Sequence, residues 1–257
     1  MSSKPSQFVW YELMTTDVAA AEAFYAKAVG WKTCDSGMPG MKYTLLSAGD
    51  YTVGGVMALD ADAIAGGARP GWGGYVGVAD VDAAAVQLKA GGGQVMHGPA
   101  DIPGVGRFAA VTDPHGAAFY LFKGNAGEMP AAPAAGTPGT VGWHELHAGD
   151  GAAALAFYAA QFGWTKDTAV DMGPMGVYQL FAAGGEAIGG MMTKTADMPA
   201  PCWLYYFNVD RADVAVDRVT GAGGKVLMGP HEVPGGSWIV QCQDPQGAMF
   251  AVVAPQR

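Results

Sequence analysis

A long internal repeat is the feature that most constrains how this chain can fold. Residues 10–32, WYELMTTDVAAAEAFYAKAVGWK, align with residues 143–165, WHELHAGDGAAALAFYAAQFGWT, and the agreement continues through paired GG, GP and DP motifs. A chain of 257 residues that is nearly all repeat predicts two similar domains. The stretch 124–140 is rich in Ala, Pro and Gly and has no apolar period, so we interpret it as the linker.

Each copy divides again into two halves with the same order of predicted elements. In the first half, the β-rich run FVWYELM precedes Asp17, a typical helix N-cap, and apolar residues then recur at helical spacing over 18–29. Gly30 is placed to end this helix, and short runs with strand alternation follow. We therefore predict an α+β protein of four βαβββ modules, paired into domains over 1–123 and 141–257. Each domain would be a curved, mostly antiparallel sheet of about eight strands with helices outside.

The composition excludes several classes of function. The formal net charge is −9 and the sequence has no run of Lys or Arg, so an electrostatic footprint for nucleic acid is missing. The sequence has no apolar stretch long enough to span a membrane and no hydrophobic run of signal-peptide length near its start. Its three cysteines are widely spaced and form no disulfide framework. We expect a cytoplasmic protein, monomeric or homodimeric, whose partner is a small molecule.

Three motifs give the chain its resemblance to a known family. They are D-x6-FY-x4-GW at 17–31 and 150–164, VADVD at 78–82, and the sequences DPHGAAFYLF and DPQGAMFAVV near the ends of the copies. On these residues, the chain resembles a tandem member of the vicinal oxygen chelate superfamily. That superfamily includes glyoxalase I, bleomycin resistance proteins and extradiol dioxygenases, and the pattern here is similar to a bacterial glyoxalase-related subgroup. Because one fold serves many functions, the site must be argued from its own residues.

The resemblance implies where metal ligands should lie. In metal-dependent members, a histidine on the first strand of a module and a glutamate on the last strand bind one divalent ion, as suits Zn, Ni, Fe or Mn. The corresponding first-strand positions here hold Trp10, Gly73, Trp143 and Leu204, and the late-strand positions hold Val56 or Met57, Tyr120, Met191 or Met192, and Ala251. We therefore expect no cofactor. A divalent metal held by Glu145 and His147, as a non-standard pair, is the alternative.

Two glutamates are the candidates for chemistry. Glu12 and Glu145 occupy the same place in the two copies, and each lies on the same strand face as the usual first-strand ligand position. Either carboxylate could act as a general base, or it could be a buried group held by a neighbouring tyrosine or backbone amides. His147 would share its face with Glu145. His144 would point to the opposite face, toward the helix, as a structural histidine.

Aromatic side chains recur at matched positions and could line a cup suited to a flat or apolar molecule, or belong to the core. The candidates for ligand binding are His147 and the aromatic residues Trp10, Tyr43, Trp72, Tyr75, Trp143, Tyr178, Trp203 and Tyr206. Two hypotheses follow. The absent ligands favour a protein that binds a small apolar or aromatic molecule without metal, as the bleomycin resistance branch does. The recurring glutamate favours the alternative, a lyase, isomerase or dioxygenase acting through Glu12 or Glu145.

Overall fold

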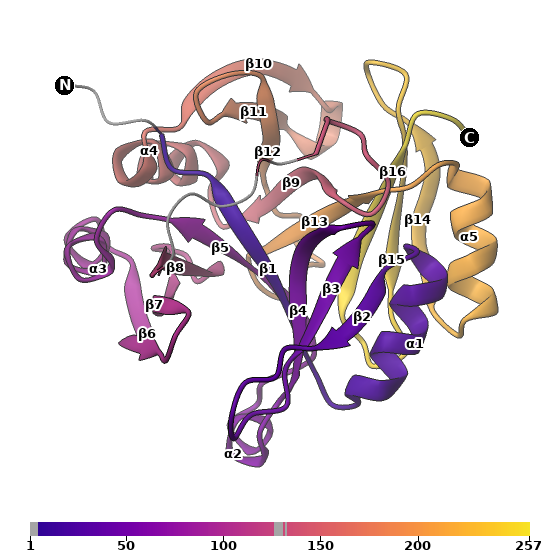
Figure 1. The fold of residues 1–257 in the computed structure, drawn as a ribbon. Helices are drawn as coiled ribbons and strands as arrows, with labels where there is room; N and C mark the ends of the chain where they lie inside the picture. The colour runs from indigo at the N-terminus through magenta and orange to yellow at the C-terminus, as the bar shows by residue number, and fades with distance from the viewer. Residues whose placement is uncertain (1–4, 126–130, 132) are drawn as a thin grey trace. The chain divides into compact units, whose positions relative to one another are not determined.

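The structure is a computed structural model that describes residues 5–125, 131 and 133–257. Its elements follow the predicted order of βαβββ modules (Figure 1). The first module contains β1 (Phe8–Thr15), α1 (Val18–Ala28), β2 (Lys32–Asp35), β3 (Thr44–Ala48) and β4 (Tyr51–Ala58), followed by the short helix α2 (Ala61–Ala65). The second contains β5 (Gly71–Gly77), α3 (Val81–Ala90), β6 (Gln94–Ile102), β7 (Gly106–Thr112) and β8 (Ala118–Gly124).

The second copy repeats this order. Its first module contains β9 (Val141–Ala148), α4 (Gly151–Phe162), β10 (Thr165–Asp171), the 3-10 turn η1 (Gly173–Met175), β11 (Val177–Ala182) and β12 (Ala187–Thr193). Its second module contains β13 (Cys202–Asn208), α5 (Ala212–Gly221), β14 (Lys225–Glu232), β15 (Trp238–Gln243) and β16 (Met249–Ala254). The prediction of an α+β protein built from this repeated module is confirmed.

Local residues determine where the helices begin and end. The Asp17 carboxylate accepts a hydrogen bond from the backbone N–H of Ala20 at 3.0 Å, which satisfies a first-turn amide of α1. Asp150 does the same at the start of α4. Gly30 follows the C-cap of α1 with φ of 90°, a left-handed conformation that favours glycine. The predicted start and stop signals of this helix are therefore confirmed.

The strands form two eight-stranded mixed sheets with equivalent orders. These are β2-β3-β4-β1-β5-β8-β7-β6 and β10-β11-β12-β9-β13-β16-β15-β14. In each module the first strand pairs in parallel with the last, as β1 does with β4 and β9 with β12. Within each module the other neighbours are antiparallel, because the three strands after the helix form a meander. The prediction of sheets of about eight strands with helices outside is confirmed.

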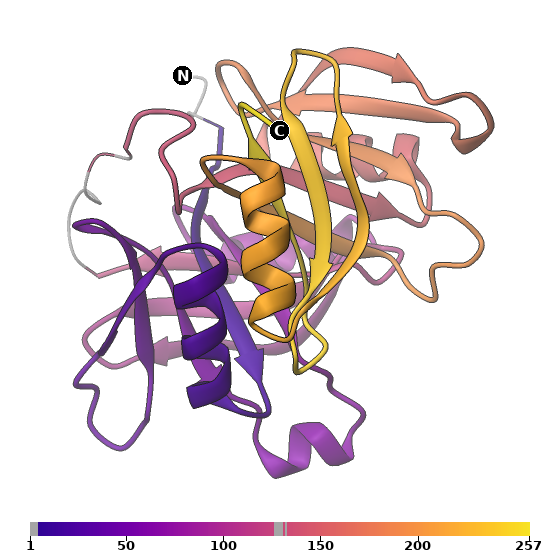
Figure 2. The same ribbon diagram turned by 90° about the vertical axis from the view of Figure 1, so that its right-hand side faces the viewer.

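The described chain divides into two compact units. The first comprises the described parts of Met1–Trp10, Gly74–Met129 and His144–Trp203, and the second those of Tyr11–Gly73, Pro130–Trp143 and Leu204–Arg257. In the first unit α3 lies against α4, and in the second α1 lies against α5. Figure 2 shows the second of these helix pairs, in indigo and orange. The predicted domain boundaries around 124–140 stay a prediction.

Tyr25 of α1 is at the centre of the aromatic core of the second unit. It is fully buried, and its hydroxyl accepts a hydrogen bond from Trp72 Nε1 at 2.8 Å. The same hydroxyl donates to Asp244 Oδ2 at 3.2 Å, and Asp244 Oδ1 accepts from the backbone N–H groups of Gln246 and Ala248. Burial raises the pKa of Asp244 above its usual range. One hydroxyl thus joins a helix, a strand and the β15–β16 turn.

Tyr158 of α4 repeats this arrangement in the first unit. Its hydroxyl accepts from Trp203 Nε1 at 3.1 Å and lies 3.5 Å from Asp113 Oδ2. Asp113 Oδ1 accepts from the backbone N–H groups of His115 and Ala117, both at 2.9 Å. The tyrosine of the FY motif and the aspartate of the DP motif therefore recur because they meet in a buried hydrogen-bond network.

Candidate functional site

Strand β9 presents Glu145 and His147 on the same face. Alternation along a strand places residues two apart on one side of the sheet, and His147 Nε2 lies 2.8 Å from Glu145 Oε1. The His147 side chain is 12% exposed and the Glu145 side chain is 10% exposed. Leu146, between them, is fully buried on the other face. The prediction that these two polar side chains lie together is confirmed.

A tyrosine from another strand completes this group. The Tyr178 hydroxyl on β11 donates a hydrogen bond to Glu145 Oε2 at 3.0 Å. We call Tyr178, Glu145 and His147 the Glu145 cluster. The cluster holds one nearly buried carboxylate between a phenol, which donates a hydrogen bond to Oε2, and an imidazole, whose Nε2 lies 2.8 Å from Oε1.

Gly190 of β12 makes room for the tyrosine. It lies opposite Glu145 in the β9–β12 pairing and opposite Leu180 in the β11–β12 pairing. A Cβ atom at this position would lie 2.2 Å from ring atoms of Tyr178, far inside van der Waals contact. The ring therefore lies directly over the glycine backbone, and this close approach allows its hydroxyl to reach the carboxylate.

The first copy uses the same placement. Glu12 lies opposite Gly55, and a Cβ atom on Gly55 would lie 2.2 Å from the hydroxyl oxygen of Tyr43. Glu12 and Tyr43 are both buried. The position equivalent to His147 is Met14, so the imidazole of the cluster belongs to the second copy alone. These glycines were not among the predicted site residues, although the repeated GG motif was the signal that could have found them.

Cys202 lies near the carboxylate but is not a nucleophile at neutral pH. Burial, and then the negative charge of Glu145, raise the pKa of its thiol to about 11. The thiol is therefore protonated at neutral pH and contributes no negative charge beside the Glu145 cluster.

The remaining aromatic candidates lie in four different environments. Trp72 and Trp203 donate their indole N–H groups to Tyr25 and Tyr158 in the two core networks. Tyr75 stacks on Tyr120, with ring centroids 4.3 Å apart. Tyr206 accepts a hydrogen bond from Gln241 Nε2 at 3.0 Å, and Trp143 packs against the cluster that contains Tyr206. Trp10 is partly buried. Their predicted roles in ligand binding stay predictions.

The donor set around Glu145 does not fit the family's metal. Within residues 5–125, 131 and 133–257, no three His, Cys, Asp or Glu side chains are grouped so that they could hold a metal ion. Glu145 and His147 supply only two donors, and these two atoms lie 2.8 Å apart. At the late-strand ligand positions, Tyr120 and Ala251 face Tyr75 and Tyr206 in the strand pairing. Catalytic zinc sites typically have three protein ligands, one more than this pair supplies.

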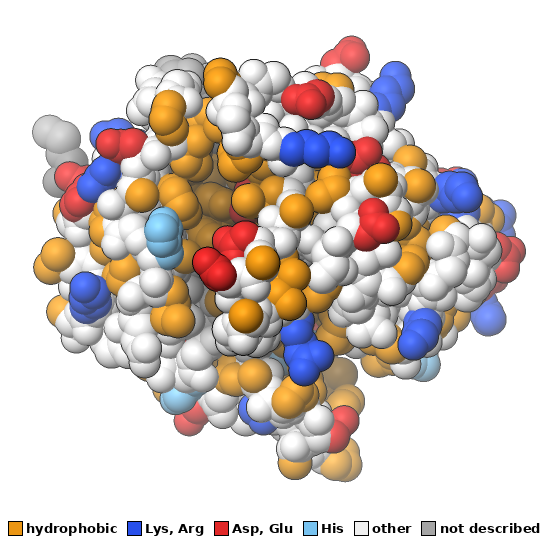
Figure 3. All heavy atoms as spheres, turned by 90° about the horizontal axis from the view of Figure 1, so that it is seen from below, with side chains coloured by type: hydrophobic (Ala, Val, Ile, Leu, Met, Phe, Trp, Pro, Cys, Tyr) orange, Lys and Arg blue, Asp and Glu red, His pale blue; other side chains and the backbone are white. Residues whose placement is uncertain are grey.

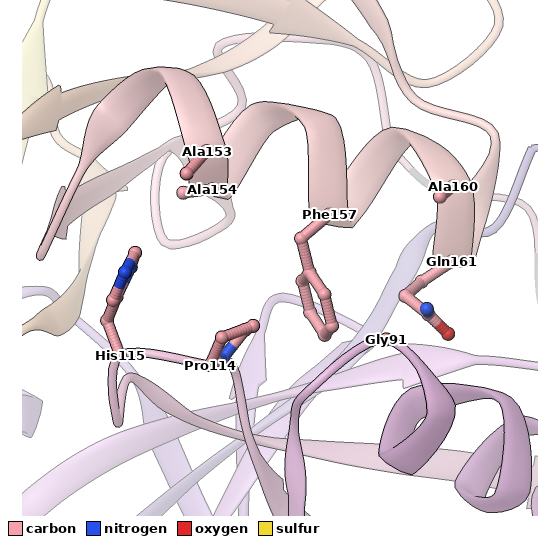
Figure 4. Close-up of a pocket in the computed structure, with 8 residues that line it drawn as sticks. All are labelled: Gly91, Pro114, His115, Ala153, Ala154, Phe157, Ala160 and Gln161. Carbon is pink, nitrogen blue, oxygen red and sulfur yellow. The ribbon is translucent and has the colours of Figure 1, made fainter.

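A cavity of about 340 Å³ lies away from this cluster, in the first unit. Its walls are α4 from Ala153 to Gln161, the β7–β8 turn at Pro114 and His115, and Gly91 after α3 (Figure 4). Figure 4 shows the Phe157 ring pointing from α4 toward that turn. None of the residues that the sequence analysis selected for the site lines this cavity.

Arg107 lies in a group of exposed ion pairs on the surface. Figure 3 shows one face, on which Lys and Arg side chains lie singly among Asp and Glu side chains. Arg107 is paired with Asp82 at 2.7 Å and with Asp101 at 2.9 Å, and the guanidinium holds the pKa of Asp82 below its usual range. In the part of the chain that the structure describes, no helix is long and apolar enough to cross a bilayer.

His144 has a structural role. It is buried, its Nδ1 hydrogen-bonds the backbone carbonyl of Ile188 at 2.7 Å, and its ring stacks on Phe8 with 4.3 Å between centroids. Because a bond to a carbonyl needs a donor, Nδ1 carries the hydrogen of the neutral ring. Burial lowers the pKa of this imidazole to about 4.

The buried His144 should make the protein less stable in acid. Between pH 6.5 and about pH 4, His144 is protonated in the unfolded chain but neutral in the folded chain, because its pKa is 6.5 when unfolded and about 4 when folded. The free energy of unfolding should therefore fall by about 3 kcal/mol from pH 7.5 to pH 4 through this residue. Urea unfolding of wild type and His144→Phe across this range measures it, because phenylalanine keeps the stacking and removes the titration. Equal pH slopes for the two proteins would contradict the assignment, and His231→Phe, at an exposed site, is the control.

The two equivalent sheets of repeated modules are the architecture of a tandem glyoxalase-like protein. The chain belongs to the glyoxalase/bleomycin resistance protein/dioxygenase superfamily, whose sequence model matches residues 7–121 and 140–252. CFP32 of Mycobacterium tuberculosis, provisionally named a glyoxylase, is 34% identical over 96% of this chain and 94% of its own. The anthracycline biosynthesis protein DnrV of Streptomyces peucetius is 32% identical over 97% of this chain and 93% of its own.

Solved structures of low sequence identity share the fold. The Mn(II)-bound glyoxalase of Novosphingobium aromaticivorans superposes with a TM-score of 0.67 at 16% identity, over 99% of this chain and 83% of that chain. A variant of homoprotocatechuate 2,3-dioxygenase from B. fuscum gives a TM-score of 0.69 at 13% identity, over 98% and 72%. At such identities the likeness shows the architecture alone.

Proposed function

We propose that this chain binds a small, flat aromatic molecule without a metal, and that the Glu145 cluster is the polar part of the site. The observation that carries the proposal is how Glu145 is held. Glu145 Oε2 accepts a hydrogen bond from Tyr178 and Oε1 lies 2.8 Å from His147 Nε2, whereas metal-dependent members use such groups as ligands. A carboxylate and an imidazole already joined at 2.8 Å offer hydrogen bonds to an organic ligand rather than a coordination sphere.

The shape of the ligand follows from the surroundings of the cluster. The Tyr178 ring lies over the Gly190 backbone, so it adds an aromatic surface beside the polar group. A flat ring with one hydroxyl or carbonyl matches a site in which few polar groups fix the orientation and aromatic groups supply contact area. Two relatives, DnrV and DauV, carry the name anthracycline biosynthesis protein, and anthracyclines are built on fused planar rings. These names support a planar aromatic ligand.

A binding experiment tests this function. We would titrate chelator-treated protein with 1-hydroxyanthraquinone and, separately, with the non-planar alcohol 4-cyclohexylcyclohexanol, using isothermal calorimetry. The planar compound should bind with Kd of about 10 μM, corresponding to roughly −7 kcal/mol, and the saturated alcohol at least about tenfold more weakly. Binding that appears only after a divalent metal is added, or equal affinity for both compounds, would refute the proposal.

The same cluster favours a second function, a lyase, isomerase or dioxygenase activity that depends on Glu145. A carboxylate that orients an imidazole is a common arrangement for moving protons. If this function holds, the protein converts an aromatic or dicarbonyl substrate, and Glu145→Gln lowers kcat while the variant remains folded. Glu12, in the equivalent position of the first copy, is the matched comparison. If the substrate binds but is not converted, only the binding function is supported.

A further inference from the structure

The contact between Glu145 and His147 determines which imidazole nitrogen can meet a ligand, because it turns Nε2 toward the carboxylate. An ionised carboxylate only accepts hydrogen bonds, so His147 Nε2, at 2.8 Å from Oε1, carries the hydrogen. A neutral imidazole has one N–H, and Nδ1 is therefore the nitrogen with the lone pair. Among the described residues, Nδ1 of His147 has no hydrogen-bond partner. The 12% exposure of this side chain leaves it reachable.

The carboxylate is itself fixed. Tyr178 donates to the second oxygen of Glu145 at 3.0 Å, and Gly190 allows the tyrosine ring to stay in place. The chain of contacts thus runs from β11 through the carboxylate to the imidazole on β9. The Glu145 oxygen held 2.8 Å from Nε2 fixes the orientation of the imidazole ring.

The groups around the imidazole do not oppose a proton at Nδ1. Met192 of β12, which faces His147 in the strand pairing, is uncharged. Cys202, at the start of β13, is a neutral thiol near neutral pH because burial and Glu145 raise its pKa to about 11. Tyr178 and Glu145 are the other titratable groups of the site, and their hydrogen bonds run toward the carboxylate.

We propose that His147 Nδ1 accepts the proton of an acidic hydroxyl group on the bound ring, and that Glu145 and Tyr178 position the imidazole. This inference rests on the proposed function, and it names the ligand class as phenols or enols, including hydroxyquinones. In the step, the ligand O–H bond breaks, its electron pair stays on oxygen, and a new N–H bond forms at Nδ1. The products are a phenolate or enolate and an imidazolium, with no oxidant, reductant or metal involved.

The two copies of the repeat differ in this respect. Met14 occupies the position of His147 in the first copy, although Glu12, Tyr43 and Gly55 reproduce the rest of the geometry. A thioether neither takes nor gives a proton at neutral pH. Proton transfer therefore belongs to the second copy, and methionine is a residue that this fold accepts at the position.

A coloured phenol tests the proposal directly. We would add an excess of the full-length protein to 4-nitrophenol at pH 7, where a free histidine side chain is mostly neutral and part of the free probe is still protonated, and record the rise in phenolate absorption near 400 nm. The methyl ether 4-nitroanisole, which has no acidic proton, measures binding to the ring alone by tryptophan fluorescence. In wild type the bound phenol should appear as phenolate and bind about tenfold more tightly than the ether. His147→Met and Glu145→Gln should bind both probes with similar affinity and show no rise in phenolate absorption.

The controls separate this inference from the proposed function. His115→Met, which places the same substitution at the cavity beside α4, should keep the phenolate signal. If wild type binds both probes equally and shows no phenolate, the proton acceptor is refuted and aromatic binding stands. If His115→Met rather than His147→Met removes the signal, the acceptor lies in the other cavity and the proposal is wrong. If neither probe binds at millimolar concentration, both proposals fail. Circular dichroism confirms that each variant is folded.

Discussion

Replacing Tyr25 by alanine is expected to lower the free energy of unfolding by about 5 kcal/mol. Removing a buried aromatic ring costs about 3–5 kcal/mol through lost contacts and the cavity that remains. The ring of Tyr25 lies 5.2–5.6 Å, centroid to centroid, from Trp31, Trp72 and Phe250, so the space cannot fill without moving other large side chains. The change also leaves Trp72 Nε1 and Asp244 Oδ2 without the hydroxyl that joins them. Urea unfolding followed by tryptophan fluorescence measures the loss.

A second substitution separates the hydroxyl from the ring. Tyr25→Phe keeps the packing and leaves one buried donor and one buried acceptor unsatisfied, which should cost about 2–3 kcal/mol. The matched control is Tyr51→Phe, in the same unit and half-buried, where the expected change is below about 0.5 kcal/mol. If Tyr25→Phe is as mild as the control, the hydroxyl network contributes nothing measurable. The alanine variant would then report packing alone.

Gly190→Ala is expected to weaken binding of a planar aromatic probe about 10- to 100-fold, which corresponds to roughly 1.4–2.8 kcal/mol. The new Cβ would lie 2.2 Å from the Tyr178 ring, and the backbone of a central strand cannot move away cheaply. The partly exposed tyrosine can swing out instead, which breaks its hydrogen bond to Glu145. The stability loss should therefore be smaller than the loss of binding. Calorimetric titration with 1-hydroxyanthraquinone and urea unfolding measure the two quantities.

The β11–β12 turn supplies the control for this variant. Gly185 has no atom within 4 Å of the position of an added Cβ, so Gly185→Ala should bind the probe as wild type does. Gly55→Ala makes the equivalent change in the first copy, where the added Cβ would meet Tyr43. Comparing Gly190→Ala with Gly55→Ala shows which copy binds the probe. Unchanged affinity in Gly190→Ala would mean that the placement of Tyr178 does not matter for binding.

Local patterns in the sequence determined the elements of this protein. Helix α1 spans Val18–Ala28, as the apolar spacing over 18–29 and the following Gly30 predict. The caps could be predicted because each aspartate acts only three residues away along the chain. The shared face of Glu145 and His147 could be predicted for the same reason, since the alternation of a strand is a local property.

Contacts between distant residues were decided only by the tertiary structure. Tyr178 is 33 residues from Glu145, and the sequence could offer it as an aromatic candidate but not as the donor to that carboxylate. From the sequence, Trp72 and Trp203 could be assigned equally to the cavity or to the core. In the structure their indole N–H groups donate hydrogen bonds to Tyr25 and Tyr158, which are 47 and 45 residues away in the sequence. Side chains far apart in sequence meet only when strands pair and helices pack, and a single sequence does not encode those distances in any local pattern. The repeat therefore determined the modules and the positions of the candidate groups, while the folded sheets decided which of those groups hydrogen-bond to one another.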